Sequence, residues 1–95
     1  MPEFPGGEKN LNKFIARSLK YPRYALENGI EGKAVVQFVV RKDGSIGDIE
    51  IVSSPHESLS NEAIRLIKLM PNWIPGTQKG EPVNVKYIFP VVFKL

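Results

Sequence analysis

The chain has 95 residues, of which 42% are hydrophobic and 24% charged, enough apolar material for one small domain and too much for intrinsic disorder. The formal net charge is +3 and the longest adjacent basic run is Arg41–Lys42, so the basic residues are too dispersed for a nucleic-acid or anionic-membrane surface. With no cysteine and one histidine, the chain has no disulfide and no common structural zinc site, and no apolar run approaches the ~18 residues that span a bilayer.

The first seven residues hold two prolines and two glycines, a composition typical of an irregular linker. We therefore expect a fragment of a longer protein, with a linker at residues 1–7 and one domain at residues 8–95. A helical pattern begins at Glu8 and should end before Pro22, because proline disfavours helical geometry in the residue before it. A second, short helix can begin with Pro22 in its first turn and end at Asn28–Gly29. The apolar face of the first helix consists of Leu11, Phe14, Ile15 and Leu19.

The clearest strand is Lys33–Arg41, in which apolar residues occupy alternate positions. Asp43–Gly44 follows and is the strongest hairpin signal in the chain. The return strand should cover about residues 45–53, where Gly47 marks a bulge or a close backbone approach. The face of the first strand that we assign to the core consists of Ala34, Val36, Phe38 and Val40.

A third helix should start at a capping box, Ser54–Glu57, with Pro55 at the first helical position, although Ser60 is a rival cap. The helix should end before residues 71–82, which are rich in proline and glycine. Those residues are expected to form an ordered loop pinned by Trp73. The apolar stripe of the helix consists of Leu59, Ala63, Leu66, Ile67 and Met70.

The last strand, Val83–Phe93, alternates along its whole length. The order of elements predicts an α+β fold, with a three-stranded antiparallel sheet packed on one face by helices. The sheet order would be second, first and last strand (2-1-3), which leaves the last strand at an edge. Pro90 supports that position, because its missing N–H must point to the open side. The outward N–H groups would then belong to Asn84, Lys86 and Ile88, and we expect this edge to dock an added strand.

No catalytic constellation is visible in the sequence. The single histidine, His56, lies near Ser54 and Ser58, and we interpret all three as exposed capping residues. Glu57 and Glu62 are five residues apart and do not share a helix face well. We expect no catalytic residue, no metal, no cofactor and no nucleic-acid partner.

With these residues placed, the chain resembles the TonB C-terminal domain family from about Phe4 to Leu95, in the version common in Bacteroidetes-type bacteria. Each motif alone is weak, and their order and spacing together are specific. The motifs are Phe4-Pro5-Gly6-Gly7, Tyr21-Pro22 with Ala25, Glu31-Gly32, Asp43-Gly44, Ile51-Val52-Ser53-Ser54, Glu62-Ala63, Met70-Pro71-Asn72-Trp73-Ile74-Pro75-Gly76, Gly80 and Pro90-Val91-Val92-Phe93.

The resemblance implies the periplasmic part of an energy transducer that is anchored in the inner membrane. Such a domain holds the TonB box of an outer-membrane transporter, which adds as a strand to the last strand of the domain. A motor of the ExbB/ExbD type, contacted through the missing N-terminal part, supplies force from the proton gradient for nutrient uptake. The partner-binding residues implied are Asn84, Val85, Lys86, Tyr87, Ile88 and Phe89, together with Tyr21 and Pro22.

One segment departs from the family pattern. The enterobacterial type has a Gln-Pro-Gln stretch before the Tyr-Pro pair, and this chain has Ser18-Leu19-Lys20, so those side-chain contacts cannot be carried over. The exposed edges and short connections also permit a strand-swapped homodimer.

Two other functions compete with the transducer. The runner-up is a periplasmic sensory or scaffold domain fused to a membrane metallopeptidase-type regulator, in which similar domains can occur. A small hydrolase that uses His56 ranks third.

Overall fold

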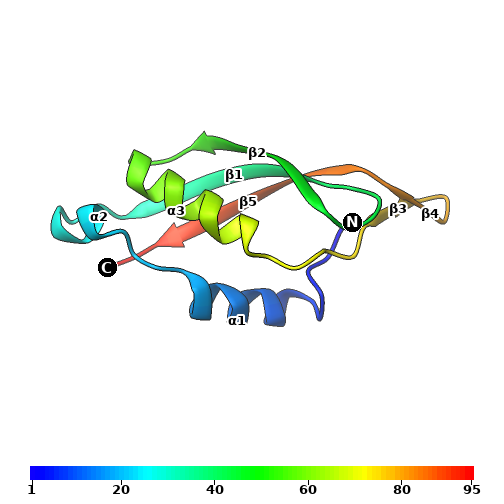
Figure 1. Cartoon of the computed structure of the whole chain (residues 1–95), viewed down its shortest axis with the longest axis horizontal. Helices are drawn as coiled ribbons and strands as arrows, with labels where there is room; N and C mark the ends of the chain where they lie inside the picture. Colours follow the sequence, from blue (N-terminus) through cyan, green and yellow to red (C-terminus); the bar gives the residue numbers. More distant parts are fainter.

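The computed structural model describes all residues, 1–95, and contains three helices and five strands (Figure 1). In chain order the elements are α1 (Glu8–Ser18), α2 (Arg23–Glu27), β1 (Gly32–Val40), β2 (Ile46–Ser53), α3 (Glu57–Lys68), β3 (Gly76–Gln78), β4 (Glu81–Val83) and β5 (Val85–Phe93). None of the three helices has the length and apolar character that crossing a membrane requires.

The main sheet has the order β2-β1-β5, and both pairs are antiparallel. The predicted α+β fold and the 2-1-3 sheet order are therefore confirmed. The molecule is elongated, with extents of 49 × 23 × 16 Å. In Figure 1, α3 lies over β1 and β2, and α1 lies on the side of β5 away from β1.

The core forms where the inward face of β1 meets the apolar stripe of α3. All four residues assigned to the core on β1, and four of the five on α3, have no exposed surface; the fifth, Met70, is 9% exposed and follows α3. Val91 and Phe93 of β5 complete the layer at 1% exposure each. Burying one large apolar side chain stabilises a fold by about 1.5–3 kcal/mol, so each large side chain of this layer matters to the stability of so small a domain.

The hairpin between β1 and β2 confirms the Asp43–Gly44 signal. The N–H of Gly44 bonds to the carbonyl of Arg41 at 2.8 Å, and Gly44 adopts φ 89°, which glycine reaches without strain. Val39 pairs with Gly47, whereas Gln37 pairs with Glu50, so β2 holds one extra residue at this point. The bulge predicted at Gly47 is therefore present.

The start of α3 differs from the prediction. The cap is His56, whose Nδ1 accepts the N–H of Ser58 at 3.0 Å, and the helix begins at Glu57. The Ser54 hydroxyl instead donates to the His56 carbonyl at 2.8 Å and so closes a turn ahead of the helix. The imidazole also stacks on Tyr24 of α2, with ring centroids 4.8 Å apart. The predicted N-cap, Ser54, was therefore wrong, and the observed cap lies two residues later in the chain. The stack on Tyr24 holds the imidazole of His56 in the capping position.

Residues 71–82 are not a plain loop. They contain β3 and most of β4, which pair as a small hairpin around Lys79 and Gly80. Both turn residues have positive φ, 53° and 81°, as a tight hairpin turn requires. Val83 belongs to β4, so the last strand of the main sheet begins two residues later than predicted, at Val85. The role expected of Trp73 is confirmed, since its side chain is 3% exposed and its backbone N–H bonds to the Gly44 carbonyl at 2.8 Å.

The N-terminal segment, residues 1–7, was expected to be a linker but packs into the domain. Glu3 and Ile74 exchange two backbone hydrogen bonds, at 3.0 and 2.8 Å. Phe4 is 6% exposed, and its ring lies 5.8 Å from Trp73 and 5.6 Å from Phe14. The core therefore begins at Phe4, ahead of the predicted domain start at residue 8.

Candidate docking edge on the last strand

One side of β5 is covered by β1 over the whole strand, from Val85 opposite Val40 to Phe93 opposite Gly32. No strand of the sheet lies on the other side. Pro90 pairs with Val35, and because proline has no N–H to donate, its ring nitrogen faces away from β1.

The backbone direction alternates along an antiparallel strand, so the N–H groups of Lys86 and Ile88 point to the same open side as the ring nitrogen of Pro90. Their side chains are exposed on the face of the sheet away from α3, whereas Tyr87 and Phe89 are half-buried on the core side. An added strand would therefore find backbone donors at Lys86 and Ile88 and aromatic side chains on one of its faces.

Asn84 does not belong to this strand. It lies in the one-residue break between β4 and β5, and its Oδ1 accepts the N–H of Lys42 at 2.9 Å. This bond ties the β1–β2 turn to the start of β5, which gives the Asn84 side chain a structural role. The regular edge within the predicted site thus runs from Val85 to Phe89.

The structure places Tyr21 and Pro22 away from that edge. The Tyr21 ring contacts Phe93 edge-on at 5.7 Å, and its hydroxyl donates to the Ile30 carbonyl. Burial, with a smaller contribution from the Glu31 carboxylate, raises the pKa of Tyr21. Phe93 lies four residues beyond Phe89, about 13 Å along the strand. The predicted partner-binding residues therefore fall into two groups at different positions along β5.

Pro22 is the N-cap of α2, one residue ahead of the helical turn in which it was predicted. The Ser18–Lys20 segment before it is held by α3. The carboxylate of Glu62 accepts the N–H of Lys20 at 2.7 Å, and Arg65 donates to the Ser18 carbonyl at 2.8 Å. This segment is therefore fixed through its backbone, whatever its side chains.

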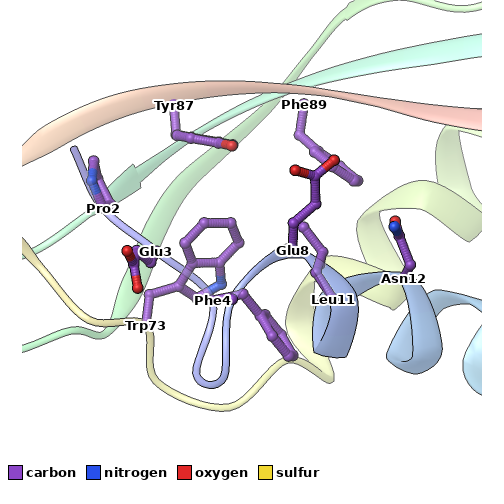
Figure 2. Close-up of a pocket in the computed structure, with 10 residues that line it drawn as sticks. Pro2, Glu3, Phe4, Glu8, Leu11, Asn12, Trp73, Tyr87 and Phe89 are labelled. Atoms are coloured by element: carbon purple, nitrogen blue, oxygen red, sulfur yellow. The ribbon is translucent and has the colours of Figure 1, made fainter.

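A groove beside β5 was not foreseen from the sequence. Its volume is about 380 Å³. Tyr87 and Phe89 of β5 form one wall, and the N-terminal segment with the start of α1 forms the other (Figure 2). The Trp73 ring lies between the two walls. The groove could not be predicted while residues 1–7 were interpreted as a linker, because four of the ten residues that line it belong to that segment.

Trp73 is the centre of an aromatic cluster at the base of this groove. Its ring centroid lies 5.0 Å from Tyr87, 5.5 Å from Phe38 and 5.8 Å from Phe4. Aromatic pairs at these separations add about 0.5–1.5 kcal/mol each beyond their buried area. The cluster therefore packs β1, β5 and the N-terminal segment together beside the edge.

The side chain of His56, which the third-ranked function would need, is engaged in structure. Its Nδ1 lies 2.9 Å from the Ser58 hydroxyl and also caps α3. No group of three or more His, Cys, Asp or Glu side chains is placed to hold a metal ion.

Residues 17–95 match the family described as Gram-negative bacterial TonB protein C-terminal. The chain is 33% identical over 82 residues to proteins called Protein TonB from two strains of Helicobacter pylori. The aligned part is 85% of this chain but 28% and 27% of those proteins, so the chain spans less than a third of their length.

Two NMR solution structures of the Helicobacter pylori TonB C-terminal domain share the fold. For residues 179–285 the TM-score is 0.67, covering 88% of this chain and 76% of that one. For residues 194–285 the TM-score is 0.62, covering 90% of each chain, and both comparisons give 28% identity. The sequence match over most of the chain and the shared fold agree, and the chain belongs to the TonB C-terminal domain family.

Proposed function

We propose that this chain is the periplasmic domain of a TonB energy transducer and that it binds the TonB box of outer-membrane transporters by strand addition at β5. The observation that carries the proposal is the open side of β5 in a member of this family. The proposed contact stretch is Val85–Phe89. Asn84 is supporting structure at its start, and the Tyr21–Pro22 pair packs at the far end of β5, against Phe93.

Main-chain pairing suits a domain that must hold a peptide under load. Each hydrogen bond contributes only about 0.5–1.5 kcal/mol net, so the affinity of a short strand is modest. Bonds that lie across the pulling direction share the load, however, and must break together. The aromatic cluster around Trp73 supports this use of β5, because it anchors the strand to the core on the side away from solvent.

The partners of the whole protein follow from the same proposal. An inner-membrane anchor and an ExbB/ExbD-type motor would act through a part of the protein outside this chain, and the domain itself would work in the periplasm without enzymatic activity, metal or cofactor. Both curated relatives are called Protein TonB, which favours the transducer over the metallopeptidase-type regulator.

Proline substitutions in β5 test the docking edge, with peptide binding measured by calorimetry. Lys86→Pro removes an outward N–H, so binding of a TonB-box peptide should weaken severalfold, whereas Lys86→Ala keeps the N–H and should bind as the unaltered domain does. Val92→Pro is the matched control, because it removes an outward N–H beyond the proposed stretch. If Lys86→Pro and Lys86→Ala bind the peptide equally well, β5 is not the docking edge.

A further inference from the structure

The groove beside β5 differs in charge from the rest of the molecule. The chain carries a net charge of +3, but the two charged residues that line the groove, Glu3 and Glu8, are both acidic. The remaining wall is largely aromatic, formed by Trp73, Tyr87 and Phe89. A volume of about 380 Å³ lies within the range of pockets that bind ligands.

Glu3 and Glu8 both line the groove, and each is held in place by its position in the fold. Glu8 is in the first turn of α1, and its carboxylate extends across the groove toward β5, near Tyr87 and Phe89 (Figure 2). Glu3 is held by its two backbone bonds to Ile74, beside Trp73. Neither carboxylate has a salt-bridge partner within the chain, since the two ion pairs of the domain are Arg23–Glu27 and Arg65–Glu62.

The groove adjoins the edge at which a strand is proposed to add. Side chains of an added strand alternate between the two faces of the sheet. Those on the same face as Tyr87 and Phe89 would point into the groove, whereas those beside Lys86 and Ile88 would remain in solvent. Every second residue of the peptide is therefore in a position to contact the groove.

We infer that the groove binds a lysine or arginine side chain of the strand added at β5. This inference rests on the proposed function. The aliphatic stem of such a side chain would lie along the aromatic wall, and its cation would reach the carboxylate of Glu8. Glu3 lies on the other side of Trp73 in Figure 2 and would add to the negative potential of the groove. An acidic side chain would be repelled by both carboxylates. An apolar side chain would remove water from these carboxylates and from Asn12 without forming hydrogen bonds to them, which is unfavourable.

Three polar residues of the groove lie ahead of the part of the chain that the family model matches. The family match begins at residue 17, whereas Glu3, Glu8 and Asn12 precede it. The sheet edge is common to the family fold, and the wall that would select a basic side chain is added by the N-terminal segment and α1. The groove thus assigns peptide selectivity to a part of the chain outside the family match.

Three peptides of one TonB-box sequence test the inference, differing at one position that carries lysine, norleucine or glutamate. Norleucine has an apolar side chain of similar length without the charge. The position is moved by one residue in a second set, so that one of the two sets points into the groove. In that set lysine should bind about five-fold more tightly than norleucine, and glutamate should bind most weakly. High salt should reduce the preference for lysine.

Variants of the domain identify the residues responsible. Glu8→Gln and Glu3→Gln should each reduce the preference for lysine, and the double variant should abolish it. Glu57→Gln is the matched control, because Glu57 also lies in the first turn of a helix but does not line the groove. Amide spectra of each free variant establish that the domain remains folded.

The outcomes separate this inference from the proposed function. If the peptides bind, Lys86→Pro weakens them, and lysine has no advantage in either set, the inference is overturned and strand addition stands. The same holds if the advantage survives the double variant. If no peptide binds, or if Lys86→Pro has no effect, the proposed function fails and the inference fails with it.

Discussion

The Glu62 carboxylate receives the backbone N–H of Lys20 at 2.7 Å, which joins α3 to the connection between α1 and α2. Arg65 completes the arrangement with two bonds of 2.7 Å to the same carboxylate. Glu62 is 8% exposed and is the one charged residue among the buried side chains. A single buried carboxylate thus positions the segment that leads into the Tyr21–Pro22 pair.

Replacing Glu62 with glutamine should destabilise the domain. The amide cannot accept both nitrogens of Arg65 and the Lys20 N–H with a full negative charge, so we expect a loss of about 1–3 kcal/mol in the free energy of unfolding. Urea denaturation measures it. The control is Glu27→Gln, which breaks the exposed pair with Arg23 and should cost less than about 1 kcal/mol. Similar losses in both variants would contradict a structural role for the buried carboxylate.

The same carboxylate makes stability depend on pH. Burial alone would raise the pKa of Glu62, but hydrogen bonds from Arg65 and from the Lys20 N–H outweigh it and lower the pKa. Because the folded pKa lies below the unfolded value of about 4.3, the contribution of Glu62 is present above that pH and is lost as the pH falls through the folded value. The difference in Tm between the unaltered domain and Glu62→Gln should therefore shrink in acid. A difference that stays constant down to about pH 2 would refute this assignment.

Phe4→Ala tests whether the N-terminal segment belongs to the core. The ring is buried against Trp73 and Phe14, so its removal should cost about 3 kcal/mol, well above the effect of a change in a free linker. Denaturant midpoints measure the loss, and Met1→Ala, at an exposed residue of the same segment, is the control. An unchanged midpoint would mean that residues 1–7 do not pack as described.

His56→Ala and His56→Asn separate the capping role of the imidazole from any chemistry. Alanine cannot accept the Ser58 N–H and should destabilise the domain by about 1 kcal/mol, whereas asparagine is a good cap and should recover most of that loss. Thermal unfolding measures both. If the two substitutions destabilise the domain equally, His56 stabilises it through its stack on Tyr24 and not through the cap.

Several features could be predicted because they depend on local patterns. Alternation in β1 and β5, the helical stripe of α3 and the Asp43–Gly44 turn each report a periodicity or a turn geometry that few residues determine. Pro90 then places β5 at an edge, since a missing N–H is visible in the sequence itself. The part of the site that consists of backbone, Val85–Phe89, was accessible for that reason, although its use in binding stays a prediction.

Other features depend on contacts between distant residues. The cap of α3 lies at His56, where α2 supplies Tyr24 as a stacking partner. Tyr21 lies at the far end of β5 from the proposed docking stretch, since its ring packs on Phe93. None of these outcomes follows from propensity, because each is decided by which surfaces meet.

The sequence by itself determined the sheet order, the edge and the family, because alternation, turn residues and a strand proline act over a few residues. The tertiary structure alone decided that Phe4 enters the core beside Trp73. That contact joins residues 69 positions apart, and it brings Glu3 and Glu8 to the face of β5 that an added strand would share. The selectivity that we propose at this edge therefore depends on long-range packing, whereas the edge itself depends on local sequence pattern.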